Sequence, residues 1–162
     1  RVRRPAMYIV GAIEFASALA TVGHFVGYRG TVCDPRALFI TPARFPDADE
    51  LVTEWPHEFL AHAPVDERTA ICVLTHDQKF DVPALQAALR TPARFIGAMG
   101  SRRTTDRRNA RLLEEGLDAA DLARVHAPIG VPIGSRTPEE VAIAIGAQIV
   151  AVTNRVSDPA VT

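Results

Sequence analysis

The stretch TAICVLTHDQKFDVPALQAALRTPARFIGAM, residues 69–99, decides the fold of this chain. It begins with an apolar run at 69–74, rich in residues that favour strands, and ends with a second such run at 93–99. Between them, residues 82–90 carry a proline in the first turn of a predicted helix and alanine and leucine through its body, as helices prefer. A strand, a helix and a strand in this order predict a right-handed crossover between two parallel strands.

The rest of the chain repeats this alternation of strands and helices. We expect strands at 6–10, 31–33 and 50–53, and helices at 15–26, at 55–63, from the segment GSRR to 115, at 118–125 and from 138 to about 154. Thr137, Pro138 and Glu140 supply an N-cap, a first-turn proline and a capping-box acid for the last helix. The sequence therefore predicts an α/β domain with a doubly wound, Rossmann-like parallel sheet, helices on both faces, and ligands at the carboxyl ends of the strands.

Length and composition predict a single globular domain covering residues 1–162. Apolar residues make up 48% of the chain and charged residues 23%, which is the balance of a protein with a packed core. Lysine and arginine total 18, against 19 aspartate and glutamate residues, so no general positive field exists to attract nucleic acid or an anionic membrane. The chain begins at Arg1 without a methionine, and we expect it to be a fragment of a longer protein.

The cysteines and the apolar segments favour a cytoplasmic location. Cys33 and Cys72 both lie inside apolar runs, and two thiols cannot build the disulfide framework of a small secreted domain. The longest helical apolar stretch, at 141–152, is too short to span a bilayer of about 30 Å and contains Gln148. We therefore expect a reducing compartment and no insertion into a membrane.

The turn after the first predicted strand, GAIEFA at 11–16, departs from the glycine-rich turn of dinucleotide-binding folds. Such folds place a glycine in the middle of the turn, so that backbone amides reach a pyrophosphate at the start of a helix. Gly11 fits the first position, but Ile13 places a branched side chain where the phosphate would pass, and Glu14 adds a carboxylate. Glu14 is better suited to stabilising the positive end of the helix dipole. The turn therefore disfavours NAD(P).

Asp34 offers a second link to a nucleotide. It follows the second predicted strand, near the position of the acid that holds a ribose hydroxyl in dinucleotide-binding folds. It either takes that role or forms a strand-ending turn with Pro35.

The loop THDQKFD at 75–81 crowds ionisable side chains just beyond a buried strand. Asp77 and Lys79 could position a polar ligand, and His76 could move a proton near neutral pH. Alternatively this is a solvated loop in which Asp81 caps the next helix. No spacing of histidines or cysteines typical of a metal site is present, so we expect no metal.

A second loop, GAMGSRR at 97–103, places Arg102 and Arg103 at the start of a predicted helix, where cations oppose the helix dipole. A bound phosphate or an acidic partner would compensate, held by helix amides, by the Ser101 hydroxyl and by the two guanidinium groups. Alternatively Asp106 pairs with the arginines on a solvated face.

A third loop, HAPIGVPIGSRTPEE at 126–140, places Arg136 just before the start of the last helix, which again suits an anion. Turn and cap chemistry explains most of its other residues, and His126 is the remaining functional candidate.

These three loops, in this order and together with GTVCDPR and TPARFPDADELV, resemble the signature blocks of the XdhC/CoxI family over nearly the whole chain. The resemblance implies the C-terminal Rossmann domain of an accessory protein for molybdenum hydroxylases such as xanthine or carbon monoxide dehydrogenase. Such a protein handles the molybdenum cofactor, including its sulfurated form, before insertion into the client enzyme. It is a cofactor chaperone and does not itself oxidise purines. The resemblance implies a preceding N-terminal domain in family members, and we expect this chain to be a fragment without it.

The molybdenum cofactor is a pterin that carries a phosphate, so the resemblance gives the three loops roles. It implies catalytic roles at the reactive end for His76, Asp77 and Lys79. The implied cofactor-binding residues are Gly11, Asp34, Thr75, Gly100, Ser101, Arg102, Arg103 and Arg136. The turn GAIEFA departs from the GAGH pattern common in relatives, which again disfavours a nucleotide there.

Two other functions stay open on the residues alone. The fold and Asp34 favour an NAD(P)-dependent oxidoreductase domain, which Ile13 and Glu14 oppose. The long apolar last helix favours a non-catalytic module that docks onto a client molybdenum hydroxylase or forms a homo-oligomer.

Overall fold

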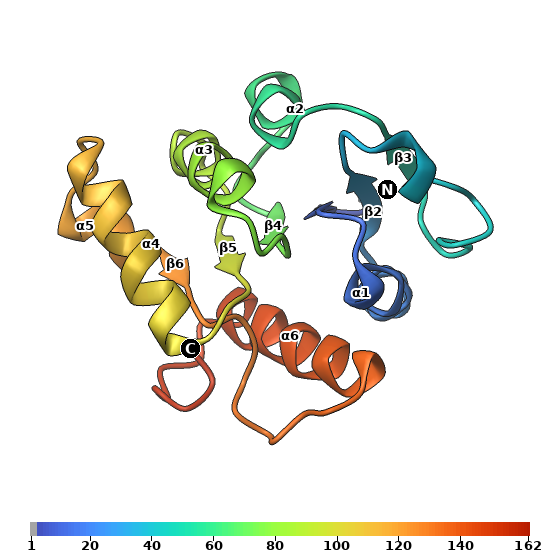
Figure 1. Cartoon of the computed structure of the whole chain (residues 1–162). Helices are drawn as coiled ribbons and strands as arrows, with labels where there is room; N and C mark the ends of the chain where they lie inside the picture. Colours follow the sequence, from blue (N-terminus) through green and yellow to red (C-terminus); the bar gives the residue numbers. More distant parts are fainter. Residues whose placement is uncertain (1–2) are drawn as a thin grey trace.

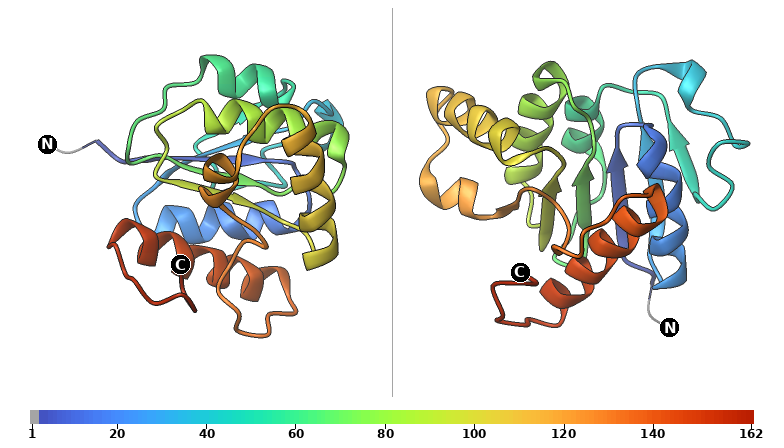
Figure 2. Two further views of the ribbon diagram at one scale, coloured as in Figure 1. Left: turned by 90° about the vertical axis from the view of Figure 1, so that its left-hand side faces the viewer. Right: turned by 60° about the horizontal axis from the view of Figure 1, so that its bottom comes forward.

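The computed structural model describes residues 3–162 and has a parallel sheet between two layers of helices (Figures 1 and 2). The strands are β1 (Ala6–Val10), β2 (Arg29–Cys33), β3 (Glu50–Val52), β4 (Ala70–Val73), β5 (Phe95–Ala98) and β6 (Val125–His126). The helices are α1 (Glu14–Phe25), the 3-10 turn η1 (Ala37–Phe39), α2 (Pro56–His62), α3 (Gln78–Leu89), α4 (Arg102–Glu114), α5 (Ala119–Ala123) and α6 (Pro138–Thr153). Helices α1 and α6 cover one face of the sheet, and α2 and α3 cover the other (Figure 1).

The strand order is β3-β2-β1-β4-β5-β6, and every neighbouring pair is parallel. The chain builds outward from β1 in one direction and then outward from β4 in the other. This doubly wound order confirms the predicted Rossmann-like sheet with helices on both faces. The direction of building reverses between β1 and β4, and ligands of such sheets bind beyond the carboxyl ends of the strands at this point.

Two elements differ from the sequence-based expectation. Strand β6 falls where the sequence predicts the end of a helix over 118–125 and the start of a loop at 126, because its two residues become a strand only by pairing with Ile96 and Gly97 of β5. Helix α3 begins four residues earlier than expected, because Asp77 and not Asp81 is its N-cap: the Asp77 side chain accepts a hydrogen bond from the Lys79 amide. Asp81 thereby lies inside the helix and faces the core.

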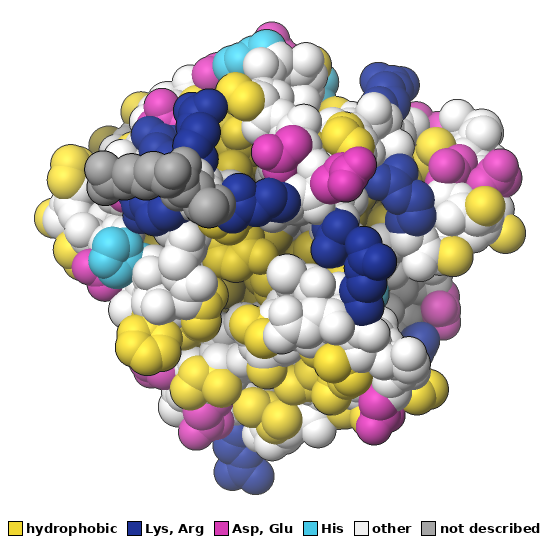
Figure 3. All heavy atoms as spheres, turned by 180° about the vertical axis from the view of Figure 1, so that it is seen from behind, with side chains coloured by type: hydrophobic (Ala, Val, Ile, Leu, Met, Phe, Trp, Pro, Cys, Tyr) yellow, Lys and Arg dark blue, Asp and Glu magenta, His cyan; other side chains and the backbone are white. Residues whose placement is uncertain are grey.

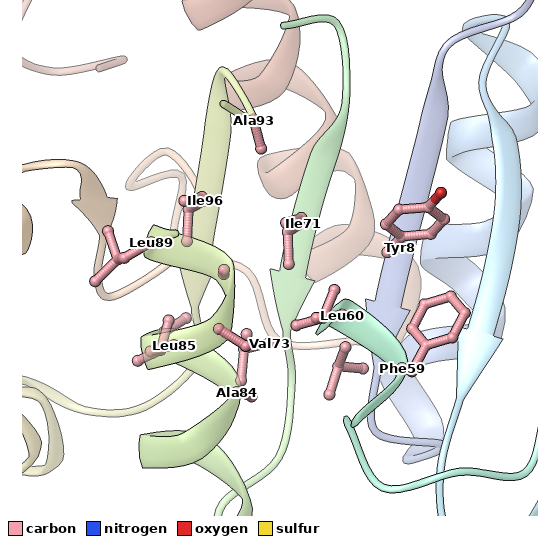
Figure 4. Packing of buried hydrophobic residues seen from close by; sticks show 14 of the residues in the cluster. Tyr8, Phe59, Leu60, Ile71, Val73, Ala84, Leu85, Leu89, Ala93 and Ile96 are labelled. Carbon is pink, nitrogen blue, oxygen red and sulfur yellow. The ribbon is translucent and has the colours of Figure 1, made fainter. Parts of the chain in front are cut away.

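Two apolar layers, one on each face of the sheet, form the core. Tyr8 and Ile71 lie on the face covered by α2 and α3, in one layer with Phe59 and Leu85 (Figure 4). The rings of Tyr8 and Phe59 meet edge to face, with centroids 5.1 Å apart. The intervening positions of the strands face α1 and α6. Burial on both faces explains why the central strands are continuous apolar runs in the sequence.

A buried ion pair connects α3 to α4 beneath the carboxyl ends of β4 and β5. Arg108 Nη1 donates to Asp81 Oδ2 at 3.4 Å and to the Met99 carbonyl at 3.1 Å. The side chains of Arg108 and Asp81 are each 1% exposed. Asp81 also accepts a hydrogen bond from the Thr75 hydroxyl. The pair therefore fixes two helices and two strand ends relative to one another.

Hydrogen bonding compensates the burial of this pair only in part. The Nε and Nη2 atoms of Arg108 have no hydrogen-bond partner within residues 3–162. Burial raises the pKa of Asp81 to about 7, against the opposing effect of Arg108. Burial also lowers the pKa of Arg108. Both shifts have the same cause, because removing a charged group from water disfavours its charged form.

No helix within residues 3–162 is long and apolar enough to cross a membrane.

The raised pKa of Asp81 predicts a specific dependence of stability on pH. Between about pH 4 and pH 7 the folded protein keeps the Asp81 proton while the unfolded chain releases it, so this residue's contribution to stability is lost as pH rises through that window. The substitution Asp81→Asn removes this titration. We expect the free energy of unfolding of the unsubstituted protein, minus that of the variant, to fall as pH rises from about 4 to 7. Denaturant titrations of both proteins over this range measure the difference, and a difference that rises with pH would show that Arg108 holds the carboxylate ionised.

The two cysteines give a second test of the core. Cys33 and Cys72 are fully buried, and burial raises the pKa of each thiol to about 12. Because the thiolate is the reactive form, we expect neither cysteine of the folded protein to react with a thiol reagent at about pH 8. Both should react once the protein is unfolded in guanidinium chloride. A colorimetric thiol titration measures this, and rapid labelling of the folded protein would contradict the packing described above.

Candidate ligand-binding crevice

A crevice of about 600 Å³ lies at the carboxyl edge of the sheet, where the strand order reverses. Loops after β1, β2 and β4 and the first turns of α3 and α4 form its walls. Its lining consists of Ile13, Arg36, Thr75, His76, Asp77, Gln78, Phe80, Thr104 and Arg107. Its volume lies within the range usual for small-molecule sites, about 300–1,000 Å³.

Thr75 forms the floor of the crevice between β1 and β4. Its hydroxyl bonds to the buried carboxyl group of Asp81, so the ion pair beneath the crevice holds this side chain in place. Gly11, at the end of β1, lies directly beside it: a Cβ atom at Gly11 would come within 2.8 Å of the Thr75 Cγ2 atom. The backbone of Gly11 also has a φ of +106°, which other residues rarely adopt. Glycine is therefore required here by the packing of the two strand ends.

Asp34 closes the turn between β1 and α1 from the side of β2. Its Oδ2 atom accepts a hydrogen bond from the Ala12 amide at 2.8 Å. Arg36 binds both carboxylate oxygens, with Nε donating at 2.8 Å and Nη2 at 2.7 Å. Burial alone would raise the pKa of Asp34, but the hydrogen bonds from Arg36 and Ala12 hold it below its usual value. The carboxylate is thus engaged within the protein, in a turn that also involves the Arg36 amide.

Two arginines from different elements bring guanidinium groups to the crevice. The Arg36 side chain, from the loop after β2, is 47% exposed although it is anchored on Asp34. Arg107 projects from α4, one turn beyond Thr104, which also lines the crevice. None of the ion pairs within residues 3–162 involves Arg107. Both guanidinium groups are therefore accessible to an anionic ligand.

An aromatic wall bounds the crevice on the side of α3. Phe80 lines the crevice, and its ring stacks on that of Trp55, with centroids 5.2 Å apart and an angle of 29° between the planes. The Lys79 ammonium lies 5.1 Å from the centroid of the Phe80 ring. Planar ring systems stack on aromatic walls of this kind.

The three residues expected to form a reactive end have different positions. His76 and Asp77 line the crevice, and both are exposed. Asp77 also caps α3, so its carboxylate serves the fold as well. Lys79 lies over Phe80 and is not part of the lining.

The predicted anion-binding loops lie outside this lining. Ser101 is the N-cap of α4 and accepts a hydrogen bond from the Thr104 amide at 3.1 Å, and Gly100 precedes it with a φ of +142°. Arg102 borders another hollow, lined mainly by the loop over residues 125–135. Arg103 and Arg136 are exposed. Thr75, His76 and Asp77 thus share the crevice, and the predicted arginines do not.

The sequence patterns did not single out the crevice residues Arg36, Phe80, Thr104 and Arg107. A signal for two of them exists in the helix RRTTDRRNARLLE, because Thr104 and Arg107 are three residues apart and therefore share one face of α4. Arg36 and Phe80 come near the other lining residues only through the arrangement of the strands.

No group of three or more His, Cys, Asp or Glu side chains within the described part of the chain is arranged to hold a metal ion.

Comparison with known proteins gives this fold and site a family. Residues 7–149 match the sequence model of the XdhC Rossmann domain. An uncharacterized protein of Escherichia coli, YqeB, is 30% identical over 151 residues, which covers 93% of this chain and 28% of that protein. A probable subunit of xanthine dehydrogenase from Bacillus subtilis is 28% identical over 95% of this chain and 44% of its own length. The E. coli molybdenum cofactor insertion chaperone PaoD is 33% identical over 57% of this chain and 29% of its own length.

A solved structure agrees with the sequence matches. The crystal structure of a xanthine dehydrogenase from Bacillus halodurans superposes with a TM-score of 0.81 at 28% identity, covering 98% of this chain and 46% of that one. The chain thus spans less than half the length of these relatives. It belongs to the XdhC family, whose Rossmann domain it matches over most of its length.

Proposed function

We propose that the crevice binds the molybdenum cofactor as cargo and that the domain serves in the maturation of a molybdenum hydroxylase. The observation that carries the proposal is the combination of two accessible guanidinium groups and an aromatic wall in one crevice at the switch point of the sheet. The cofactor is a pterin with a phosphate, so an aromatic wall suits its ring system and the guanidinium groups suit its phosphate.

The phosphate would bind between Arg36 and Arg107. These side chains come from opposite sides of the crevice, so an anion between them would receive charge-assisted hydrogen bonds from both. The hydroxyl of Thr104 is the neutral donor on the same helix face as Arg107. Because Arg36 is held by both oxygens of Asp34, its guanidinium is oriented before a ligand arrives.

The pterin would lie against Phe80, whose ring Trp55 supports from behind. His76 and Asp77, which follow β4, are then the ionisable groups available to the reactive end of the cargo. His76 would exchange protons near neutral pH, and Asp77 would accept hydrogen bonds from pterin N–H groups. Lys79 lies over the Phe80 ring and outside the lining, so it has no direct contact with the cargo in this arrangement.

A dinucleotide is the less suitable ligand. Its pyrophosphate would need the amides of the turn before α1, but the Ala12 amide already donates to Asp34. Ile13 occupies the crevice wall next to this amide, and Asp34 has both oxygens engaged by Arg36 and so offers little to a ribose hydroxyl.

The names of relatives support the same role. One relative is a molybdenum cofactor insertion chaperone, and another is a probable subunit of xanthine dehydrogenase. On this proposal the client is a molybdenum hydroxylase, and the domain holds and delivers the cofactor without oxidising the client's substrate. Arg102, Arg103 and Arg136 are exposed and lie outside the crevice lining, and on this proposal they are suited to contact with an acidic surface of the client.

Charge reversal on α4 tests the position of the phosphate. We expect Arg107→Glu to raise the dissociation constant for purified molybdenum cofactor at least about tenfold, because a lost charge-assisted hydrogen bond contributes about 1.5–3 kcal/mol. Arg103→Glu on the same helix is the matched control and should leave the affinity nearly unchanged. Anaerobic calorimetric titration measures both, with NAD as a control ligand.

Loss of affinity in the Arg103 variant alone would place the phosphate at the start of α4, as the sequence predicts. Binding of NAD without binding of the molybdenum cofactor would contradict the proposal and support the oxidoreductase alternative.

A further inference from the structure

Helices α1 and α6 present an apolar groove to solvent on the face of the sheet opposite α2 and α3. The groove has a volume of about 720 Å³ and is lined by Phe25, Val26, Ile143, Ala147 and Val150, among others. Phe25 is 88% exposed and Ile143 is 55% exposed. In Figure 3 apolar side chains gather in the lower half of the molecule, where α6 lies, with Lys and Arg side chains above them around a hollow. The lining is mainly apolar, as the centre of a protein–protein contact is.

The two helices run in the same direction and touch closely. A Cβ atom at Gly146 of α6 would lie 2.6 Å from the Val22 Cγ1 atom of α1, so this glycine permits the crossing. The first turns of both helices border one small hollow, which contains Glu14 and Glu139. Their last turns border another, which contains Val26 and Val150. The groove therefore has a defined beginning and end.

The two ends of the groove carry opposite charges. Glu14 and Glu139 form the acidic end, and the hollow that they border shares Val22 and Ile143 with the groove. The basic end is a hollow of about 500 Å³ that continues the groove beyond Val150. Its arginines are Arg3, Arg4, Arg68 and Arg94.

Most of these charged side chains form no ion pair within the described part of the chain. Within residues 3–162, Arg4 pairs with Asp49, but no ion pair involves Arg68 or Arg94. The same holds for Glu14 and Glu139. Acidic side chains at helix starts and basic ones at helix ends match the helix dipoles, which add to the charge at each end.

We propose that this face is a two-fold interface between two copies of the chain. The two-fold axis lies in the plane of the interface and crosses the groove at right angles at its centre. This axis brings the two faces together with α1 and α6 of one copy antiparallel to those of the other. The apolar middle of the groove then covers its own equivalent, and each acidic end meets the basic end of the partner. Self-complementarity of this kind is what a two-fold interface requires, because both copies contribute the same patch.

The groove suits a second copy better than a bilayer. The arginines line a recess, which a flat membrane surface does not enter, whereas the turns of a partner's helices do. The helices also provide a long contact, because α1 has 12 residues and α6 has 16, roughly 18 and 24 Å at 1.5 Å per residue. The crevice at the carboxyl edge of the sheet stays outside the groove, so this proposal does not depend on the proposed function.

The oligomeric state in solution tests the proposal without any ligand. We expect sedimentation equilibrium of the protein to fit a reversible or stable dimer, and Ile143→Asp to give a monomer with unchanged circular dichroism. Leu113→Asp, which changes an equally exposed apolar residue on α4, is the control and should leave the dimer intact.

Charge exchange tests the two-fold arrangement itself. Glu139→Arg and Arg94→Glu should each raise the dimer dissociation constant several-fold, and their combination in one chain should restore it, since the two ends are then exchanged together. A monomer at all concentrations, or a dimer that survives Ile143→Asp, would overturn the proposal. So would failure of the combined variant to recover, or binding of monomeric protein to vesicles of anionic phospholipid through this face.

Discussion

The arrangement of the carboxyl edge of the sheet depends on the hydrogen bonds of the Arg108 guanidinium group. It lies in the core between α3 and α4, bound to Asp81 and to the Met99 carbonyl. A buried arginine that loses its partner costs about 3–5 kcal/mol, so both helices must keep their positions relative to β4 and β5. The Thr75 hydroxyl hydrogen-bonds to Asp81, so the position of Thr75 at the floor of the crevice depends on the same pair. The carboxyl edge of the sheet is therefore built on a buried polar pair and not on loops alone.

A second polar link, between the Ala12 amide and Asp34, shapes the other side of the crevice. In dinucleotide-binding folds the turn after β1 offers its amides to a pyrophosphate, and an acid after β2 holds a ribose. In this chain the turn and the acid hydrogen-bond to each other, because the Ala12 amide donates to the Asp34 carboxylate. Asp34 also orients Arg36 into the crevice, so the same carboxylate both closes a nucleotide site and presents a cation.

The fold was predictable because its strands are buried on both faces and its helices carry clear end signals. An apolar run such as 69–74 is typical of a strand that is buried on both faces. The capping box at Thr137 locates the first residue of α6. The start of α3 was not predictable, because Asp77 and Asp81 are both good N-caps and only the burial of Asp81 beside Arg108 decides between them. Strand β6 depends on pairing with β5 and has no signal of its own.

The site was harder to predict, and α4 shows why. Its arginines have the same chemistry and very different positions: Arg102 and Arg103 are exposed at the first turn, Arg107 lines the crevice, and Arg108 is buried in the core. A cation at a helix start opposes the helix dipole and therefore suggests an anion site. Exposure to solvent is enough to screen this unfavourable interaction without any ligand. What distinguishes Arg107 is the face of the helix, which it shares with Thr104, and that face is defined only once β4 and α3 are packed beside it. Residue type suggests the charge that a ligand would carry. The packing of neighbouring elements decides which arginine lines the crevice.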